Sequence, residues 1–204
     1  GLHRRTALGK LGAKAIVALV LPDRKLAFEI LALNTEKAHN LREKALEVVR
    51  MHRALGGIED VAEDRYAFQF EEPALITLGL MYERRPRFSG GAYQSVLRKC
   101  EAFLPEPLSA ALGRREARAK KIEALDDSVN GVIERLTARG IKSPYLRAFV
   151  VARINPLRFK KDAAPADFDA TFDKMLASAA KFDADKVRTE EIARTGGAPE
   201  EPGT

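Results

Sequence analysis

The chain has 204 residues, enough for one sizeable domain or two small ones, and its hydrophobic content of 46% is that of a globular protein. A single cysteine, Cys100, excludes an internal disulfide and a cysteine-rich zinc site. The longest uncharged apolar run, residues 15–21, is too short for a transmembrane helix, which needs about 20 residues, and no signal peptide is recognisable. These features predict a cytoplasmic protein that does not enter a membrane.

The net charge of +6 is concentrated in one part of the sequence. Between Glu83 and Lys121 there are ten lysines and arginines and four acids, so this segment carries an excess equal to that of the whole chain. A basic excess confined to one segment is typical of a surface that binds a polyanion such as DNA. A solvated helical face is the alternative explanation, and charge alone does not separate the two.

In chain order, the sequence predicts a buried strand followed by a series of helices. The short, partly β-branched apolar run at residues 15–21 is predicted to be a strand, because a proline and an aspartate follow it. Asn40 and Glu43 form a capping box, which predicts a helix from there to about Leu55, where two glycines follow. The predicted fold class is therefore α+β and mainly helical.

The rest of the chain is predicted to be helical up to a frayed tail. The boundaries follow from the positions of proline and glycine and from the helical spacing of apolar residues. The expected helices lie at about 74–83, 92–103, 108–138 (one or two helices), after Ser143 and Pro144, and at about 168–182, and the tail is polar and rich in glycine and proline.

The N-terminal sequence resembles the second motif of ParB-type N-terminal domains. In that family the motif is roughly G-E-(R/H)-R-x-R-A, followed by a helix, a glycine and a strand, and this chain begins GLHRRTALGKLGAKAIVALVL. The later stretch ILALNTEKAHNLREKALEVV resembles the next family motif, A-L-x-E-N-x-Q-R followed by L-N-P-x-E-E-A. Two motifs in the family's order and spacing make the resemblance specific over residues 1–55. Because the family's first motif would precede Gly1, we interpret the chain as an N-terminally truncated fragment.

The resemblance implies a nucleotide pocket. In a phosphate cradle, a glycine lets the backbone approach, and N–H groups with cationic side chains bind the oxyanions. In the ParB family the nucleotide is CTP with magnesium, and its binding closes a dimer into a clamp around DNA. The residues of this chain that match the pocket are Gly1, His3, Arg4, Asn34 and Lys37.

Three positions depart from the family motifs. Leu33 stands where the family has a glutamate that serves the metal, Thr6 where it has a third arginine, and Leu2 where it has another glutamate. Two interpretations follow: a pocket that binds CTP with magnesium, or a retained fold with a degenerate pocket. Nucleotide hydrolysis would be weak at most, and no catalytic residue or metal ligand is assigned.

The basic segment resembles, more loosely, the helix-turn-helix that follows in ParB proteins. Residues 85–108, RPRFSGGAYQSVLRKCEAFLPEPL, correspond to the family's G-x-S-x-S-x-V-S-N-x-L-R-L-L-x-L-P. The helix expected at 74–83 would be the supporting helix and that at 92–103 the recognition helix. The aromatic residues Tyr82, Phe88 and Tyr93 either join this surface or belong to the core. The candidate DNA-binding residues, which offer phosphate and base-edge contacts, are Arg84, Arg85, Arg87, Ser89, Tyr93, Gln94, Ser95, Arg98 and Lys99.

Residues 143–159, SPYLRAFVVARINPLRF, match no part of the family. Arg147, Arg153 and Arg158 would extend the basic surface or be ordinary solvated positions, and the second interpretation is the simpler one. The predicted domains are 1–55, the C-terminal part of a ParB-like nucleotide-binding domain, 56–106, a helix-turn-helix-like region, 107–194, a helical C-terminal region, and 195–204, a disordered tail.

The sequence as a whole predicts a ParB-like DNA-binding protein of the chromosome or plasmid partition type, or a regulator. We expect a nucleoid-associated homodimer whose partners are DNA and, by the resemblance, a partition ATPase. Two alternatives from other classes stay open: a ParB-fold enzyme, such as a small-molecule kinase or a nuclease-like protein, and an interaction scaffold with a vestigial ParB-like portion.

Overall fold

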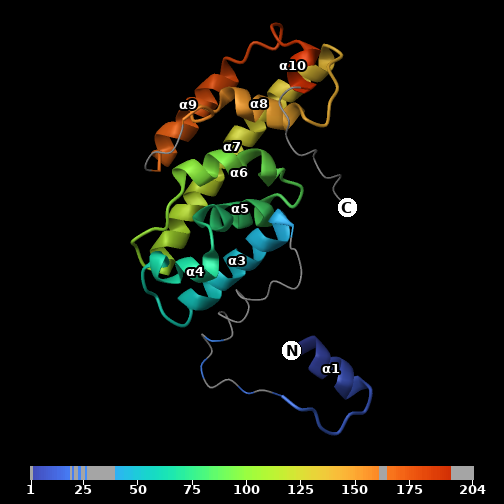
Figure 1. The fold of residues 1–204 in the computed structure, drawn as a ribbon, viewed down its shortest axis with the longest axis vertical. Coiled ribbons are helices and arrows are strands. Elements are labelled where there is room, and N and C mark those ends of the chain that lie inside the picture. Colours follow the sequence, from blue (N-terminus) through green and yellow to red (C-terminus); the bar gives the residue numbers. More distant parts are fainter. Residues whose placement is uncertain are drawn as a thin grey trace. The chain divides into compact units, whose positions relative to one another are not determined.

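The computed structural model describes residues 2–18, 20, 23, 26, 40–160 and 165–193. The chain forms two compact units, Gly1–Asn34 and Thr35–Thr204. The first unit contains one described helix, and the described part of the second unit is mainly helical (Figure 1). The helices are α1 (Leu2–Lys10) in the first unit, and α3 (Leu41–Gly56), the 3-10 helix η1 (Glu63–Tyr66), α4 (Ala67–Phe70), α5 (Pro73–Arg84), α6 (Gly90–Cys100), α7 (Leu108–Ala138), α8 (Leu146–Ile154), α9 (Phe168–Ala180) and α10 (Thr189–Ala193) in the second.

The strand predicted at residues 15–21 is not formed by the residues described there. Residues 15–18 and 20 are in no strand, and the side chains of Val17 and Val20 are exposed. A strand needs a neighbour that bonds its backbone N–H and C=O groups, and the only β-type pairing in the described part of the chain is an isolated bridge between Ala62 and Pro107. The mainly helical part of the predicted fold class is confirmed.

The helix α3 starts where the sequence predicts. The Asn40 side chain accepts a hydrogen bond of 2.9 Å from the backbone N–H of Glu43, as the capping box requires. The buried face of α3 packs on α5, and Gly79 permits the close approach, because a Cβ at this position would lie 2.2 Å from the carbonyl oxygen of Ala45. The predicted domain boundary at residue 55 therefore lies inside the second unit.

The helix α7 connects the other helices of the second unit. It is one helix of 31 residues, about 46 Å long. The sequence predicts either one or two helices over this range. It contacts α3, α5, α8 and α9 (Figure 1). Its buried stripe includes Ile122, Leu125, Val129 and Val132, which are fully buried. The packing of α7 thereby fixes the α5–α6 hairpin relative to the C-terminal helices.

Polar side chains before α8 and α9 accept hydrogen bonds from nearby backbone N–H groups. Ser143 accepts a hydrogen bond of 3.2 Å from the backbone N–H of Tyr145, directly before α8. Asp167 caps α9 by accepting a bond of 2.6 Å from the N–H of Ala170. The predicted tail at 195–204 lies outside the described residues. None of the helices in the described part of the chain is long and apolar enough to cross a membrane.

Candidate nucleic-acid interface

The candidate interface is the hairpin formed by α5, the turn at residues 85–89 and α6. The predicted helix at 74–83 is confirmed, whereas the second helix spans residues 90–100 instead of 92–103. It ends early because Glu101 has an extended backbone, with φ −96° and ψ 132°, and its side chain enters a buried ion-pair network. The two helices thus form a tight hairpin with a short turn.

A column of aromatic side chains holds this turn in place. Phe88 is buried between Tyr82 and Tyr93, with ring centroids 5.8 Å and 5.1 Å away. Gly90 leaves room for the column, because a Cβ there would lie 2.4 Å from the Tyr82 hydroxyl oxygen. All three aromatic residues belong to the core, so the prediction that Tyr93 contacts DNA is wrong. Burial raises the pKa of Tyr93 well above its usual value.

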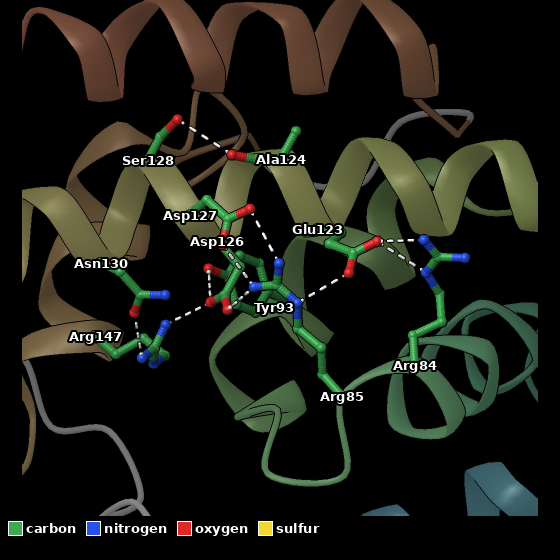
Figure 2. A network of polar contacts seen from close by, with 10 residues as sticks. All are labelled: Arg84, Arg85, Tyr93, Glu123, Ala124, Asp126, Asp127, Ser128, Asn130 and Arg147. Atoms are coloured by element: carbon green, nitrogen blue, oxygen red, sulfur yellow. Dashed lines mark hydrogen bonds and ion pairs between the residues drawn. The ribbon is translucent and has the colours of Figure 1, made fainter.

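Two adjacent arginines, Arg84 at the end of α5 and Arg85 at the start of the turn, are paired with carboxylates of α7. Arg84 donates two hydrogen bonds, of 2.8 and 2.5 Å, to Glu123 Oε2. Arg85 donates to Glu123 Oε1 at 3.0 Å and to both oxygens of Asp127 at 2.7 and 3.0 Å, so its guanidinium lies between the two acids (Figure 2). These bonds lower the pKa of Glu123 and of Asp127. The pairing holds the turn against α7.

Asp126 links the hairpin to α8. Its carboxylate is nearly buried, accepts a hydrogen bond of 2.8 Å from the Tyr93 hydroxyl, and is bonded to Arg147 (Figure 2). Arg147 also donates to Asn130 Oδ1 at 2.7 Å. Arg85 lies 3.5 Å from the same carboxylate. Arg147 is therefore a half-buried structural residue, and the prediction of an ordinary solvated position is wrong for it.

The remaining candidate residues lie on the surface of the hairpin and differ in their exposure and in their bonding partners. Arg98 forms a bidentate pair with Glu72, at 2.8 and 2.7 Å. Lys99 donates to two backbone carbonyl oxygens, as described below. Ser95 and Arg87 are exposed, and Arg87 forms no ion pair with any residue of the described ranges. Ser89 and Gln94 are half-buried.

The folded segment consequently exposes fewer free positive charges than its sequence suggests. Arg115 is fully buried, and most of the other cations are bonded to acids or carbonyl groups. Only two of the ten, Arg87 and Lys120, are exposed with no ion pair or hydrogen bond to the described residues. The bonded ones are Arg84, Arg85, Arg98, Lys99, Arg114, Arg118 and Lys121.

Arg115 is the centre of a buried ion-pair network that the sequence did not predict. It donates to Glu63 at 3.2 and 2.5 Å and to the carbonyl oxygen of Ala102 at 2.8 Å, and it is also bonded to Glu101. Glu63 has further partners in His52 at 3.2 Å and the N–H of Leu104 at 2.9 Å. This network ties α3, η1, α6 and α7 together.

The hydrogen bonds around Glu63 outweigh the effect of its burial. Burial alone would raise the pKa of this carboxyl, but the bonds from His52 and Arg115, the charge of Arg115 and the N–H of Leu104 lower it to about 2. Glu63 is therefore ionised at neutral pH. Next to this network, burial raises the pKa of the Cys100 thiol to about 12, so that the thiol is neutral.

The predicted nucleotide-binding residues are only partly described. His3 and Arg4 lie on the first turns of α1, with exposed side chains. Gly1, Asn34 and Lys37 lie outside the described residues. Within the described ranges, no three histidine, cysteine, aspartate or glutamate side chains gather where they could hold a metal ion.

Comparisons of the chain with protein-family models, with curated proteins and with solved structures found no match.

Proposed function

We propose that this chain is a ParB-like DNA-binding protein of the partition or regulatory type, and that α6 is its recognition helix. The exposed face of α6 is the observation that carries the proposal. Gly91, Gln94, Ser95 and Arg98 are spaced by three and four residues, so they lie on one face, which is exposed at Gly91, Ser95 and Arg98 and half-buried at Gln94. Such a face can enter the major groove, where amide and hydroxyl groups read base edges.

The rigidity of the hairpin supports the same role. The aromatic column and the Arg85–Asp127 pairs fix the turn, so α6 needs little ordering when it binds a partner. Arg87 projects from this turn as an exposed cation and is suited to contact a phosphate. In this proposal Arg98 exchanges its exposed pair with Glu72 for a phosphate on binding.

The experiment is a salt titration of binding to a random-sequence DNA duplex, followed by fluorescence anisotropy. We expect Arg87→Ala to weaken binding to all sequences and to reduce the slope of log affinity against log salt by about 0.9, because one phosphate contact is lost. Lys142→Ala is the matched control, since Lys142 is an exposed cation between α7 and α8. If wild-type protein binds no duplex even at low salt, the proposal fails and the interaction scaffold becomes the better function.

We further propose that the first unit belongs to an α+β nucleotide-binding domain, with Gly1, His3, Arg4 and Asn34 as the residues that bind CTP and magnesium. This rests on the sequence resemblance alone, and so do the homodimer, the partition ATPase and nucleoid association. Crosslinking with labelled CTP and ATP tests it. Selective labelling by CTP that is lost in a His3→Ala/Arg4→Ala variant would support the pocket, and equal labelling of both proteins would contradict it.

A further inference from the structure

The segment after α8, residues 155–160, is a short loop with internal support. The backbone N–H of Leu157 donates to Asn155 Oδ1 at 2.8 Å, and the N–H of Lys160 donates to the carbonyl of Leu157 at 3.1 Å. The Leu157 side chain is buried. The loop therefore has a defined shape and an apolar anchor.

The loop is attached to the proposed recognition helix. Lys99, on the last turn of α6, donates hydrogen bonds of 3.0 Å to the carbonyl oxygens of Leu157 and Lys160. The carbonyl of Lys99 in turn accepts a bond of 2.8 Å from the N–H of Ala166. Lys99 lies one helical turn after Ser95, so the loop borders the exposed face of α6 at its C-terminal end.

The loop presents an aromatic ring between cations. Phe159 is 85% exposed, more than any other large hydrophobic side chain described in the second unit. The guanidinium of Arg158 lies over this ring, 5.1 Å from its centroid. Arg158 and Lys160 are exposed, and no carboxylate in the described ranges pairs with either. This contrasts with the hairpin, where most cations are paired with acids.

We propose that residues 155–160 form a second DNA contact beside α6. Arg158 and Lys160 bind phosphates of the strand that borders the groove, and Phe159 packs against a deoxyribose of the same strand. The inference rests on the proposed function of the hairpin. It follows from the complementarity to a polyanion of these two cations, which pair with no carboxylate in the described ranges, and from the attachment of the loop to α6 through Lys99. In this arrangement the contacts run along the whole of α6, about 16 Å, from Arg87 to Phe159.

Three variants of the full chain test the loop in the same anisotropy assay. The double variant Arg158→Ala/Lys160→Ala removes two cations, and Arg65→Ala/Lys142→Ala is its charge-matched control on exposed residues of other elements. We expect the first to reduce the salt slope by about 1.8 and the second to leave it unchanged. Phe159→Ala should weaken binding by about tenfold with the same salt slope, because it removes apolar contact and no charge.

The outcomes separate the loop from the hairpin. If Arg87→Ala weakens binding while both loop variants bind as wild type, the loop proposal is overturned and the hairpin proposal stands. If wild type binds no duplex, both fall. If vesicles of phosphatidylglycerol but not duplex DNA bind wild type, and Phe159→Ala abolishes that binding, the loop faces lipid and the proposal is also overturned.

Discussion

Arg114 and Arg115 are neighbours on α7 in opposite environments. Arg115 is fully buried between Glu63 and Glu101, whereas the Arg114 side chain is 53% exposed and pairs with Glu106 at 2.6 Å. Removing Arg115 leaves Glu63 and Glu101 buried without the positive charge that offsets the cost of their burial. Removing Arg114 leaves Glu106, whose side chain is 29% exposed to water.

We therefore expect Arg115→Met to lower the free energy of unfolding by about 3–5 kcal/mol. Arg114→Met should lower it by less than about 1 kcal/mol. Urea unfolding followed by circular dichroism measures both values. Similar losses for the two variants would show that the buried network does not contribute in the way its geometry indicates.

Gly90 and Gly91, neighbours at the start of α6, also lie in different environments: a side chain would clash at Gly90 and would fit at Gly91. A Cβ at Gly90 would meet the Tyr82 hydroxyl at 2.4 Å and Leu78 Cδ2 at 3.1 Å, whereas nothing lies within 4 Å of a Cβ at Gly91. Alanine has the higher helix propensity, by roughly 0.5–1 kcal/mol. Gly91→Ala should raise the melting temperature and Gly90→Ala should lower it. A rise for both would mean that the aromatic column tolerates displacement.

At the scale of elements, the proposed function implies that the acids of α7 compete with DNA for Arg84 and Arg85. Glu123 and Asp127 bond Arg84 and Arg85 through side chains that are partly exposed. Exposed pairs of this kind contribute about 0–1 kcal/mol to stability. Their neutralisation should consequently leave the fold intact and release two cations.

We expect Glu123→Gln/Asp127→Asn to bind duplex DNA more tightly than wild type and to steepen the salt slope by up to about 1.8. Glu116→Gln/Glu134→Gln is the matched control, because it neutralises two exposed acids of the same helix that form no hydrogen bond or ion pair with the hairpin within the described residues. Equal gains for both double variants would assign the effect to net charge instead of the released arginines.

The sequence predicted local features of these elements well. The Asn40 cap, the start of α5 at Pro73 and the position of Ser143 before α8 depend on residues within a few positions of each other. The pairs that define the hairpin surface are different, since Arg85 and Asp127 are separated by 42 residues, and Arg115 and Glu63 by 52. No spacing rule reveals such partners, and for this reason the sequence alone predicts a basic surface for the segment rich in arginine.

The prediction of DNA contacts failed at Tyr93 for a related reason. Aromatic residues interleaved with arginines fit either a stacking surface or a packed turn, and only the position of Phe88 between Tyr82 and Tyr93 decides for the second. The strand at residues 15–21 was predicted from its apolar run, but a strand also depends on partners that a local pattern does not contain.

At the scale of the whole molecule, the free energy of unfolding of the second unit should decrease at acidic pH. The pKa of Glu63 falls from 4.5 to about 2 on folding, so below pH 4.5 the unfolded chain takes up a proton that the folded chain does not. The stability from this carboxylate, about 3 kcal/mol, is present above pH 4.5 and is lost between about pH 4.5 and 2. Urea unfolding at a series of pH values measures it, and a stability that stays constant down to pH 3 would contradict it.

The most direct test of the proposed DNA-binding face is an NMR titration of the ¹⁵N-labelled chain with a duplex. We expect the largest amide shifts in the turn at residues 85–89, at Gln94, Ser95 and Arg98 on α6, and at Phe159 in the loop after α8. Small shifts are expected on α9 and α10, which lie outside this face. Shifts confined to α9, α10 or α1, or no shifts at low salt, would contradict the assignment of α6 as the recognition helix.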